Sequence, residues 1–152
     1  MIRRRAFLTV TAGAAIYGGM AMPIGVRAQG GEPLALKGYD PVAYFTDAKP
    51  TPGLEQFELL WDGQRYRFAN AKHREMFKAS PDKYAPQFGG LCAMNLSNGV
   101  RRESDPHNWV ISNGNLYVFA GERGMQNFTR APAEIAARAA AHLRAQKASA
   151  TQ

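Results

Sequence analysis

Two tight-turn dipeptides, Asp62-Gly63 and Asn113-Gly114, constrain the fold of this chain more than any other feature of its sequence. Both pairs tolerate the left-handed backbone that a two-residue hairpin loop requires at its central positions. Strand-forming segments flank them, over residues 56–61 and 64–68 for the first pair and over residues 108–112 and 115–119 for the second. The sequence therefore predicts two antiparallel hairpins.

Helix signals follow each hairpin. Asn70 is a suitable N-cap for a helix over residues 71–79, and Pro81 opens one further helical turn to residue 84. After the second hairpin, residues 121–128 suit a short helix, and an alanine-rich helix is expected from Pro132 to about residue 147.

This order of elements predicts an α+β fold, with a small antiparallel sheet from two hairpins and helices packed on one face. Asp40-Pro41 opens a short helical turn over residues 42–45, and the glycine-rich segment 85–93 is expected to be irregular. We infer no sequence repeat between the two hairpins and do not expect them to be copies of one unit. The expected core is aromatic and includes Trp61, Phe68, Phe77, Trp109 and Tyr117.

The first 28 residues have the layout of an export signal. Arg3-Arg4-Arg5 precedes a weakly apolar run rich in alanine and glycine, and Val26-Arg27-Ala28 is a small-x-small cleavage site. We expect a twin-arginine signal peptide over residues 1–28, with the twin-arginine export machinery as partner and a periplasmic location. An uncleaved anchor and an ordinary secretory signal are the alternatives. The run is too rich in glycine for a good membrane span, so none is expected to persist after cleavage.

Cleavage would leave 124 residues, which suits one domain. We expect a flexible N-terminus over residues 29–33, a single domain over residues 34–147 and a disordered tail over residues 148–152. The mature chain would carry 15 basic and 12 acidic residues, a net charge of +3. Because these charges are interspersed, the sequence shows no nucleic-acid footprint.

Cys92 is the single cysteine of the chain, so an internal disulfide is excluded. It follows Gly89-Gly90-Leu91, and Met94 lies two residues further on. A thiolate with a nearby thioether suits copper(I), and an imidazole from His73 would add a ligand that copper and zinc both accept. The alternatives are a buried, inert thiol and a histidine at the edge of the core.

Two residues near the start of the domain are further candidates. Asp40 precedes Pro41 and either caps the helical turn or joins Tyr39 beside the thiol. The remaining histidines, His107 and His142, are expected to be solvated.

Five motifs occur in order along residues 34–120: Leu36-Lys37-Gly38-Tyr39-Asp40-Pro41-Val42-Ala43-Tyr44-Phe45, Trp61-x-Gly63-x-x-Tyr66-x-Phe68, Phe77-x-x-x-Pro81-x-x-Tyr84-x-Pro86-Gln87-Phe88-Gly89-Gly90-x-Cys92-Ala93, Asp105-Pro106-x-x-Trp109 and Gly114-x-Leu116-Tyr117. Together they resemble the exported bacterial proteins that carry a YHS domain. The resemblance implies a small module related to treble-clef and metallochaperone-type cysteine motifs.

The metal-binding form of the YHS domain has the pattern Asp-Pro-Val-Cys followed by Phe-Cys-x-x-x-Cys-x-x-x-Phe. By this resemblance Ala43 and Ala69 stand at the first two cysteine positions, and His73 stands at the third. Two thiol ligands of the inherited site are therefore missing. Cys92 belongs to the Gly-Gly-x-Cys-Ala motif of the exported group and could rebuild a site with His73.

Three functions follow as hypotheses. The first is a periplasmic metal-binding protein without catalysis of its own, for copper or as second choice zinc, with Cys92 and His73 as ligands and Tyr39, Asp40 or Met94 completing the shell. The second is a metal-free module that binds a small molecule or a periplasmic protein partner. The third is an enzyme that uses Cys92 as nucleophile and His73 as base.

Overall fold

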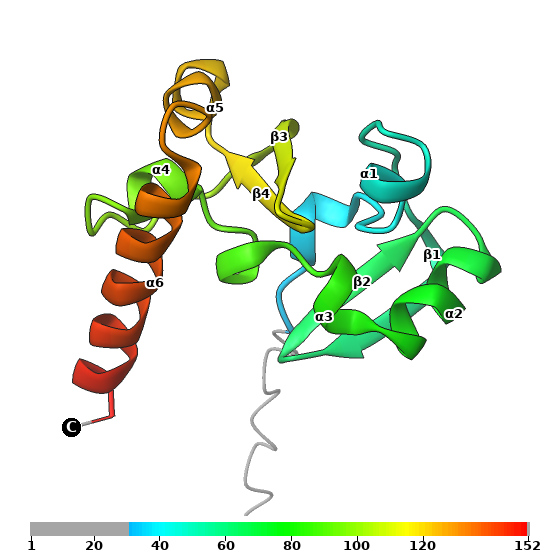
Figure 1. The fold of residues 1–152 in the computed structure, drawn as a ribbon. Helices are drawn as coiled ribbons and strands as arrows, with labels where there is room; N and C mark the ends of the chain where they lie inside the picture. Colours follow the sequence, from blue (N-terminus) through cyan, green and yellow to red (C-terminus); the bar gives the residue numbers. More distant parts are fainter. Residues whose placement is uncertain (1–30, 152) are drawn as a thin grey trace, which may run out of the picture.

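The computed structural model describes residues 31–151, which form short helices, two hairpins and one long C-terminal helix (Figure 1). In chain order the elements are the left-handed turn η1 (Ala35–Gly38), α1 (Ala43–Thr46), β1 (Leu54–Trp61), β2 (Gln64–Phe68), α2 (Ala71–Ala79), α3 (Pro81–Tyr84), the left-handed turn η2 (Gln87–Gly90), α4 (Ala93–Leu96), β3 (Asp105–Ser112), β4 (Asn115–Phe119), α5 (Glu122–Phe128) and α6 (Pro132–Ser149). The expected α+β class is confirmed.

Both predicted hairpins form, and each is a sheet of its own. β1 pairs with β2 and β3 pairs with β4, both antiparallel, and among the described strands no hydrogen-bonded ladder joins the two pairs. The expectation of one small sheet is corrected to two two-stranded sheets. Asp62 and Asn113 adopt φ of 47° and 50°, as the turn dipeptides predicted.

The described chain contains an internal repeat, so the expectation that the hairpins are not copies of one unit is wrong. Left-handed turn, helix, hairpin and two helices occur once over residues 34–85 and again over residues 86–149, which we call the first and second unit. Strand pairs of the second hairpin lie 51 residues after their counterparts in the first: Leu54↔Phe68 matches Asp105↔Phe119, with a register shift following in both hairpins. Each unit is therefore a copy of the same topology.

The same aromatic cluster forms the centre of each unit. In the first unit Phe77 of α2 packs on Tyr66 and Phe68 of β2, at ring-centroid distances of 4.8 and 5.2 Å. In the second unit Phe128 of α5 packs on Tyr117 and Phe119 of β4, at 4.7 and 5.1 Å. The aromatic positions are 51 residues apart in the sequence, so repeated burial of the same three rings explains the repeated fold.

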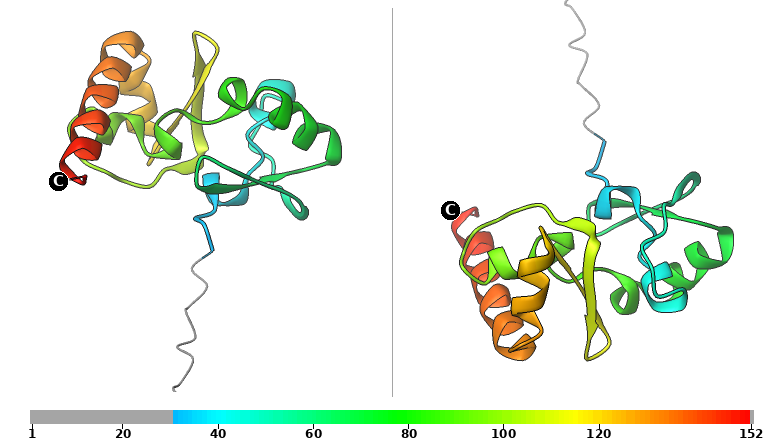
Figure 2. Two further views of the ribbon diagram at one scale, coloured as in Figure 1. Left: turned by 90° about the horizontal axis from the view of Figure 1, so that it is seen from below. Right: turned by 90° about the horizontal axis from the view of Figure 1, so that it is seen from above.

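A third group of buried side chains joins the two units. Leu36 and Tyr44 of the first unit pack on Leu116 and Val118 of β4 in the second. Figure 2 shows β3 and β4 between the helices of the first unit on one side and α4, α5 and α6 on the other. The second hairpin thus contributes to the core of its own unit and to the contact between units.

The other expectations have mixed outcomes. α2 has the predicted bounds, and the Asn70 side chain accepts a hydrogen bond from His73 N as an N-cap. α4 begins at Ala93, the last residue of the segment expected to be irregular, and α6 continues to Ser149, beyond the expected end. The expected signal peptide lies outside the described residues. Among residues 31–151, no helix is both long and apolar enough for a membrane span.

Candidate functional site

The Asp40 carboxylate is fully buried and accepts four hydrogen bonds. Oδ1 accepts from Val42 N at 2.8 Å and from Ala43 N at 3.3 Å. Asp40 thus accepts from backbone N–H groups at the start of the helical turn, as expected, although α1 runs over Ala43–Thr46 and its N-cap residue is Val42. Oδ2 accepts from Ala69 N at 2.9 Å and from His73 Nδ1 at 2.6 Å. Asp40 therefore ties α1, the end of β2 and α2 together.

The bond to Asp40 determines which nitrogen of His73 remains available. A carboxylate only accepts hydrogen bonds, so Nδ1 is the donor to Asp40, and in the neutral ring Nε2 carries the free lone pair. Nε2 lies 3.4 Å from Oγ1 of Thr46, the last residue of α1. His73 is 7 % exposed, and Thr46 is exposed. His73 Nε2 therefore lies just beneath the surface, next to the exposed residue Thr46.

Cys92 lies in the second unit, in the position that Asp40 has in the first. Asp40 N donates to Thr51 O, and Cys92 N donates to Arg102 O, 51 residues after Thr51. The Cys92 side chain is 1 % exposed and packs in an apolar cluster with Ala93, Tyr117, Phe119, Phe128 and Ile135. The structure therefore does not bring Cys92 and His73 together: each belongs to the core of a different unit.

The second unit has no counterpart of the buried imidazole. Gly124 stands 51 residues after His73, and a Cβ placed on it would lie 3.5 Å from Cβ of Met94. Met94 packs against the same apolar cluster as Cys92. Cys92 and Met94 thus belong to one apolar cluster, in surroundings where a small apolar side chain would serve as well as the thiol.

Tyr39 contacts His107 rather than Cys92. The Tyr39 hydroxyl lies 3.1 Å from His107 Nε2, and the two rings meet edge to face with centroids 5.3 Å apart. Beside them, the Tyr44 hydroxyl donates to Pro106 O at 2.9 Å. Burial raises the pKa of Tyr44, and nearby acidic groups raise it further. These contacts join the first unit to the start of β3.

The described residues do not fit the copper site expected from the sequence. Within residues 31–151, no three His, Cys, Asp or Glu side chains converge on a point where they could hold a metal ion. Asp40 is saturated by protein donors, and the Cys92 thiol faces apolar side chains of the other unit. A ligand set that uses both Cys92 and His73 is therefore not formed.

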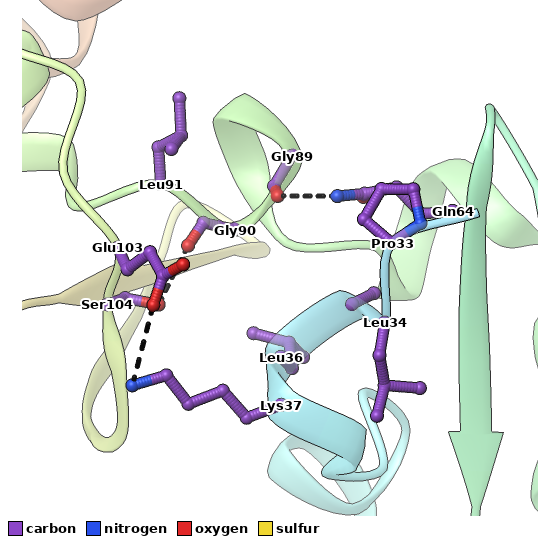
Figure 3. A pocket seen from close by; sticks show the side chains of 11 residues that line it. Pro33, Leu34, Leu36, Lys37, Gln64, Gly89, Gly90, Leu91, Glu103 and Ser104 are labelled. Atoms are coloured by element: carbon purple, nitrogen blue, oxygen red, sulfur yellow. Dashed lines mark hydrogen bonds and ion pairs between the residues drawn. The ribbon is translucent and has the colours of Figure 1, made fainter. Parts of the chain in front are cut away.

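A cavity of about 250 Å³ lies where the two units meet, and we call it the seam cavity (Figure 3). η1 and η2, the equivalent turns of the two units, both line it. Its apolar walls include Leu34, Leu36 and Leu91. The cavity therefore exists only because the chain contains both units.

Consecutive left-handed residues shape both turns that line the seam cavity. Leu36 and Lys37 have φ of 48° and 53°, and Phe88 and Gly89 have φ of 58° and 65°. This conformation is unfavourable for residues with a Cβ, at roughly 1 kcal/mol or more each. Such strain at Leu36, Lys37 and Phe88 is compatible with a functional role for the turns.

Polar groups from both units surround the seam cavity. Lys37 Nζ lies 4.0 Å from Glu103 Oε2, and these side chains are 56 % and 88 % exposed. Ser104 Oγ donates to Gly90 O at 2.7 Å, and Gln64 Nε2 donates to Gly89 O at 3.2 Å. The Ser104 hydroxyl and the Gln64 amide thus stabilise the backbone of η2, which lines the cavity. The charged groups of Lys37 and Glu103 form only a long ion pair and are accessible to solvent.

No family model, curated protein or solved structure matches this chain.

Four residues were not among the candidates that the sequence suggested: Thr46, which lies beside His73, and three polar residues that line the seam cavity, Lys37, Gln64 and Glu103. A signal for the repeat was present, because Gly-x-x-Tyr-x-Phe-Ala is followed by Phe and Pro at equal distances in both units. Recognising it would have placed Cys92 and His73 in different units.

Proposed function

We propose that this protein is an exported binding module of the YHS type that holds a small zwitterionic molecule in the seam cavity. The single observation that carries the proposal is a cavity between two equivalent turns, with one cationic and one anionic side chain beside it. The motif resemblance and the twin-arginine pattern support the scaffold and a periplasmic location.

The charge arrangement favours a ligand that carries both signs. A ligand carboxylate would pair with Lys37, and a ligand ammonium would pair with Glu103. The two side chains come from different units, so a ligand of this kind would bridge them. Leu36 and Leu91 offer an apolar surface for the rest of the molecule. A free aliphatic amino acid combines these features.

The existing contact between Lys37 and Glu103 would not prevent binding. An exposed ion pair contributes about 0–1 kcal/mol, because water screens both charges. At 4.0 Å this pair is at the outer limit of such contacts. A ligand that supplies one opposite charge to each side chain would therefore replace a weak interaction with two.

Copper binding is the other prediction from the sequence, and it would need either Cys92 or His73 alone. Among residues 31–151, no group of three His, Cys, Asp or Glu side chains could hold a metal ion around either residue. Metal analysis of the protein exported in its own host, with and without Cys92→Ala, tests that prediction directly. The hypothesis of a Cys92 nucleophile has no support in this geometry, because the thiol is buried away from His73.

Calorimetric titration with leucine, N-acetylleucine and leucinamide tests the proposed function. Leucine should bind, and the two analogues should bind at least about fivefold more weakly, since each lacks one charge and a lost ion pair is worth about 1 kcal/mol. Alanine, valine and methionine extend the panel to other aliphatic side chains.

Variants at the seam cavity provide the matched controls. Lys37→Gln and Glu103→Gln should each weaken binding about fivefold, whereas Lys72→Gln and Glu122→Gln, at exposed positions outside the cavity lining, should leave it unchanged. The proposal is wrong if none of the free amino acids binds, or if the analogues bind as tightly as leucine.

A further inference from the structure

Outside the seam cavity, three side chains of the first unit form a chain of two consecutive hydrogen-bonding contacts. Asp40 Oδ2 accepts from His73 Nδ1 at 2.6 Å, and His73 Nε2 lies 3.4 Å from Thr46 Oγ1. This is a carboxylate, an imidazole and a hydroxyl in the order that activates a hydroxyl nucleophile. None of the three lines the seam cavity, so the inference is independent of the proposed function.

The imidazole is fixed in the form that can act as a base. Asp40 accepts backbone hydrogen bonds from Val42, Ala43 and Ala69, which hold the carboxylate in place. The carboxylate in turn fixes the His73 ring and keeps the proton on Nδ1. The lone pair of Nε2 is then directed at Thr46.

The hydroxyl is both accessible and only weakly engaged. Thr46 is exposed at the end of a four-residue helix, where an electrophile can approach it. Its Oγ1 also donates to Val42 O at 3.2 Å, so the hydroxyl proton has two alternative acceptors. Rotation of the hydroxyl from Val42 O to His73 Nε2 would prepare it for attack.

We propose that Thr46 is an acyl-acceptor site, activated by His73 and positioned by Asp40, for activated esters and thioesters. In the step, Oγ1 forms a bond to the acyl carbon while His73 Nε2 takes the hydroxyl proton. The bond from the acyl carbon to the leaving oxygen or sulfur breaks, and the leaving group receives the proton from His73. The products are a Thr46 ester and a free alcohol or thiol.

The size of the effect follows from general-base catalysis. A well-placed base accelerates such a step about 10²–10⁴-fold. The distance of 3.4 Å is slightly longer than an ideal hydrogen bond, so the lower end of this range applies. We therefore expect acylation of Thr46 about 100-fold faster than acylation of a threonine without a base.

Thr129 is a matched internal control. It is exposed, follows the last turn of α5, and its Oγ1 donates to Gln126 O at 2.8 Å, a back-bond like that of Thr46. Across residues 31–151, no imidazole is hydrogen-bonded to it. The ratio of acylation at the two threonines within one protein sample thus isolates the contribution of His73.

Peptide mass mapping after treatment of the mature protein with 4-nitrophenyl acetate tests the proposal. Thr46 should be acetylated about 100-fold faster than Thr129, His73→Ala should bring the ratio close to one, and added imidazole should restore part of it. If His73→Ala does not fold, the ratio of the Thr46 and Thr129 acetylation rates in the unaltered chain alone tests the proposal. A ratio near one in that chain, or an undiminished ratio in folded His73→Ala, overturns the proposal.

Discussion

A buried carboxylate and a buried thiol occupy equivalent positions in the two units, and their surroundings determine what each can do. The buried Asp40 carboxyl group needs hydrogen-bond partners, and it finds them just before α1, just after β2 and in α2. Cys92 needs none, and it packs as a small apolar side chain. The first unit is therefore stabilised by a polar connection that the second unit lacks.

Removal of the His73 imidazole should destabilise the fold strongly. His73→Ala leaves Oδ2 of the buried Asp40 carboxylate without its imidazole hydrogen-bond donor, and loss of such a partner lowers the free energy of unfolding by about 1–3 kcal/mol. His142→Ala, at an exposed position of α6, should change it by less than about 0.5 kcal/mol. Urea denaturation of both variants measures the difference, and equal stabilities would contradict the structural role of the pair.

Alkaline pH should weaken the fold through Tyr66. Burial, and less so Asp62, raises the pKa of Tyr66 to about 12 from its ordinary value of 10. Because the pKa of Tyr66 is higher in the folded than in the unfolded chain, its neutral hydroxyl contributes fully to stability below pH 10. This contribution is lost as pH rises from about 10 to 12, since Tyr66 ionises in the unfolded chain at a lower pH than in the folded chain. The loss is on the order of 2 kcal/mol.

Tyr66→Phe provides the comparison, because it removes the ionisable hydroxyl and keeps the ring. Its free energy of unfolding, measured between pH 9 and about 12, should fall less steeply than that of the unaltered chain. Tyr44 and Tyr117, whose pKa values burial also raises, should maintain part of the decline. An identical dependence of the free energy of unfolding on pH in the two proteins would show that folding does not raise the pKa of Tyr66.

Helix caps differ between the units, although the helices they precede are equivalent. The Asn70 side chain caps α2, whereas α5 begins after Gly121, which has no side chain to accept a hydrogen bond. Both residues have extended backbone, with φ of −157° and −176°. The second unit therefore tolerates a helix start that a better cap could improve.

Exchanging the caps should change stability in opposite directions. Asn70→Ala should lower the free energy of unfolding by about 1 kcal/mol, and Gly121→Asn should raise it by a few tenths of a kcal/mol, roughly the difference between these caps. A Cβ at Gly121 meets nothing within 4 Å, so no clash opposes the gain. Thermal unfolding of the two variants tests both signs, and destabilisation by Gly121→Asn would contradict the assigned cap position.

The regular elements were predictable where local signals are strong. Turn dipeptides located both hairpins, and Asn70 with Pro81 located α2 and α3. α4 was missed because its four residues follow two glycines, a composition that favours irregular backbone. The separation into two sheets could not be predicted, because strand edges carry no local signal for whether another strand joins them.

The sequence analysis also selected Asp40 and His73, which form the buried polar pair, but it paired His73 with Cys92. Asp40, His73 and Cys92 were all candidates, and only tertiary structure shows that Asp40 and Cys92 are equivalent positions of two units. The repeat was hidden because the spacing is 51 residues in the hairpins and 52 from Leu36 to Phe88 in the turns. A single fixed period therefore aligns only part of each unit.

The shared cluster between the units should make the whole molecule unfold as one. Leu116 is fully buried and contacts the group that includes Leu36 and Tyr44 of the first unit. Leu116→Ala should lower the free energy of unfolding by about 2–5 kcal/mol and reduce amide-exchange protection in both units. Leu60→Ala, at a position that is 56 % exposed, should leave protection nearly unchanged. Loss of protection confined to the second unit would show that the units unfold separately.

The seam cavity is formed by both units together, and the proposed function requires that a zwitterionic ligand occupies it. A titration of the protein with leucine, followed by amide chemical shifts, tests this binding most directly. Binding at the seam should move the amide signals of Leu36, Lys37, Gly89, Gly90 and Glu103 most. The largest shifts in α4 and α6, or no shifts at millimolar leucine, would contradict the claim.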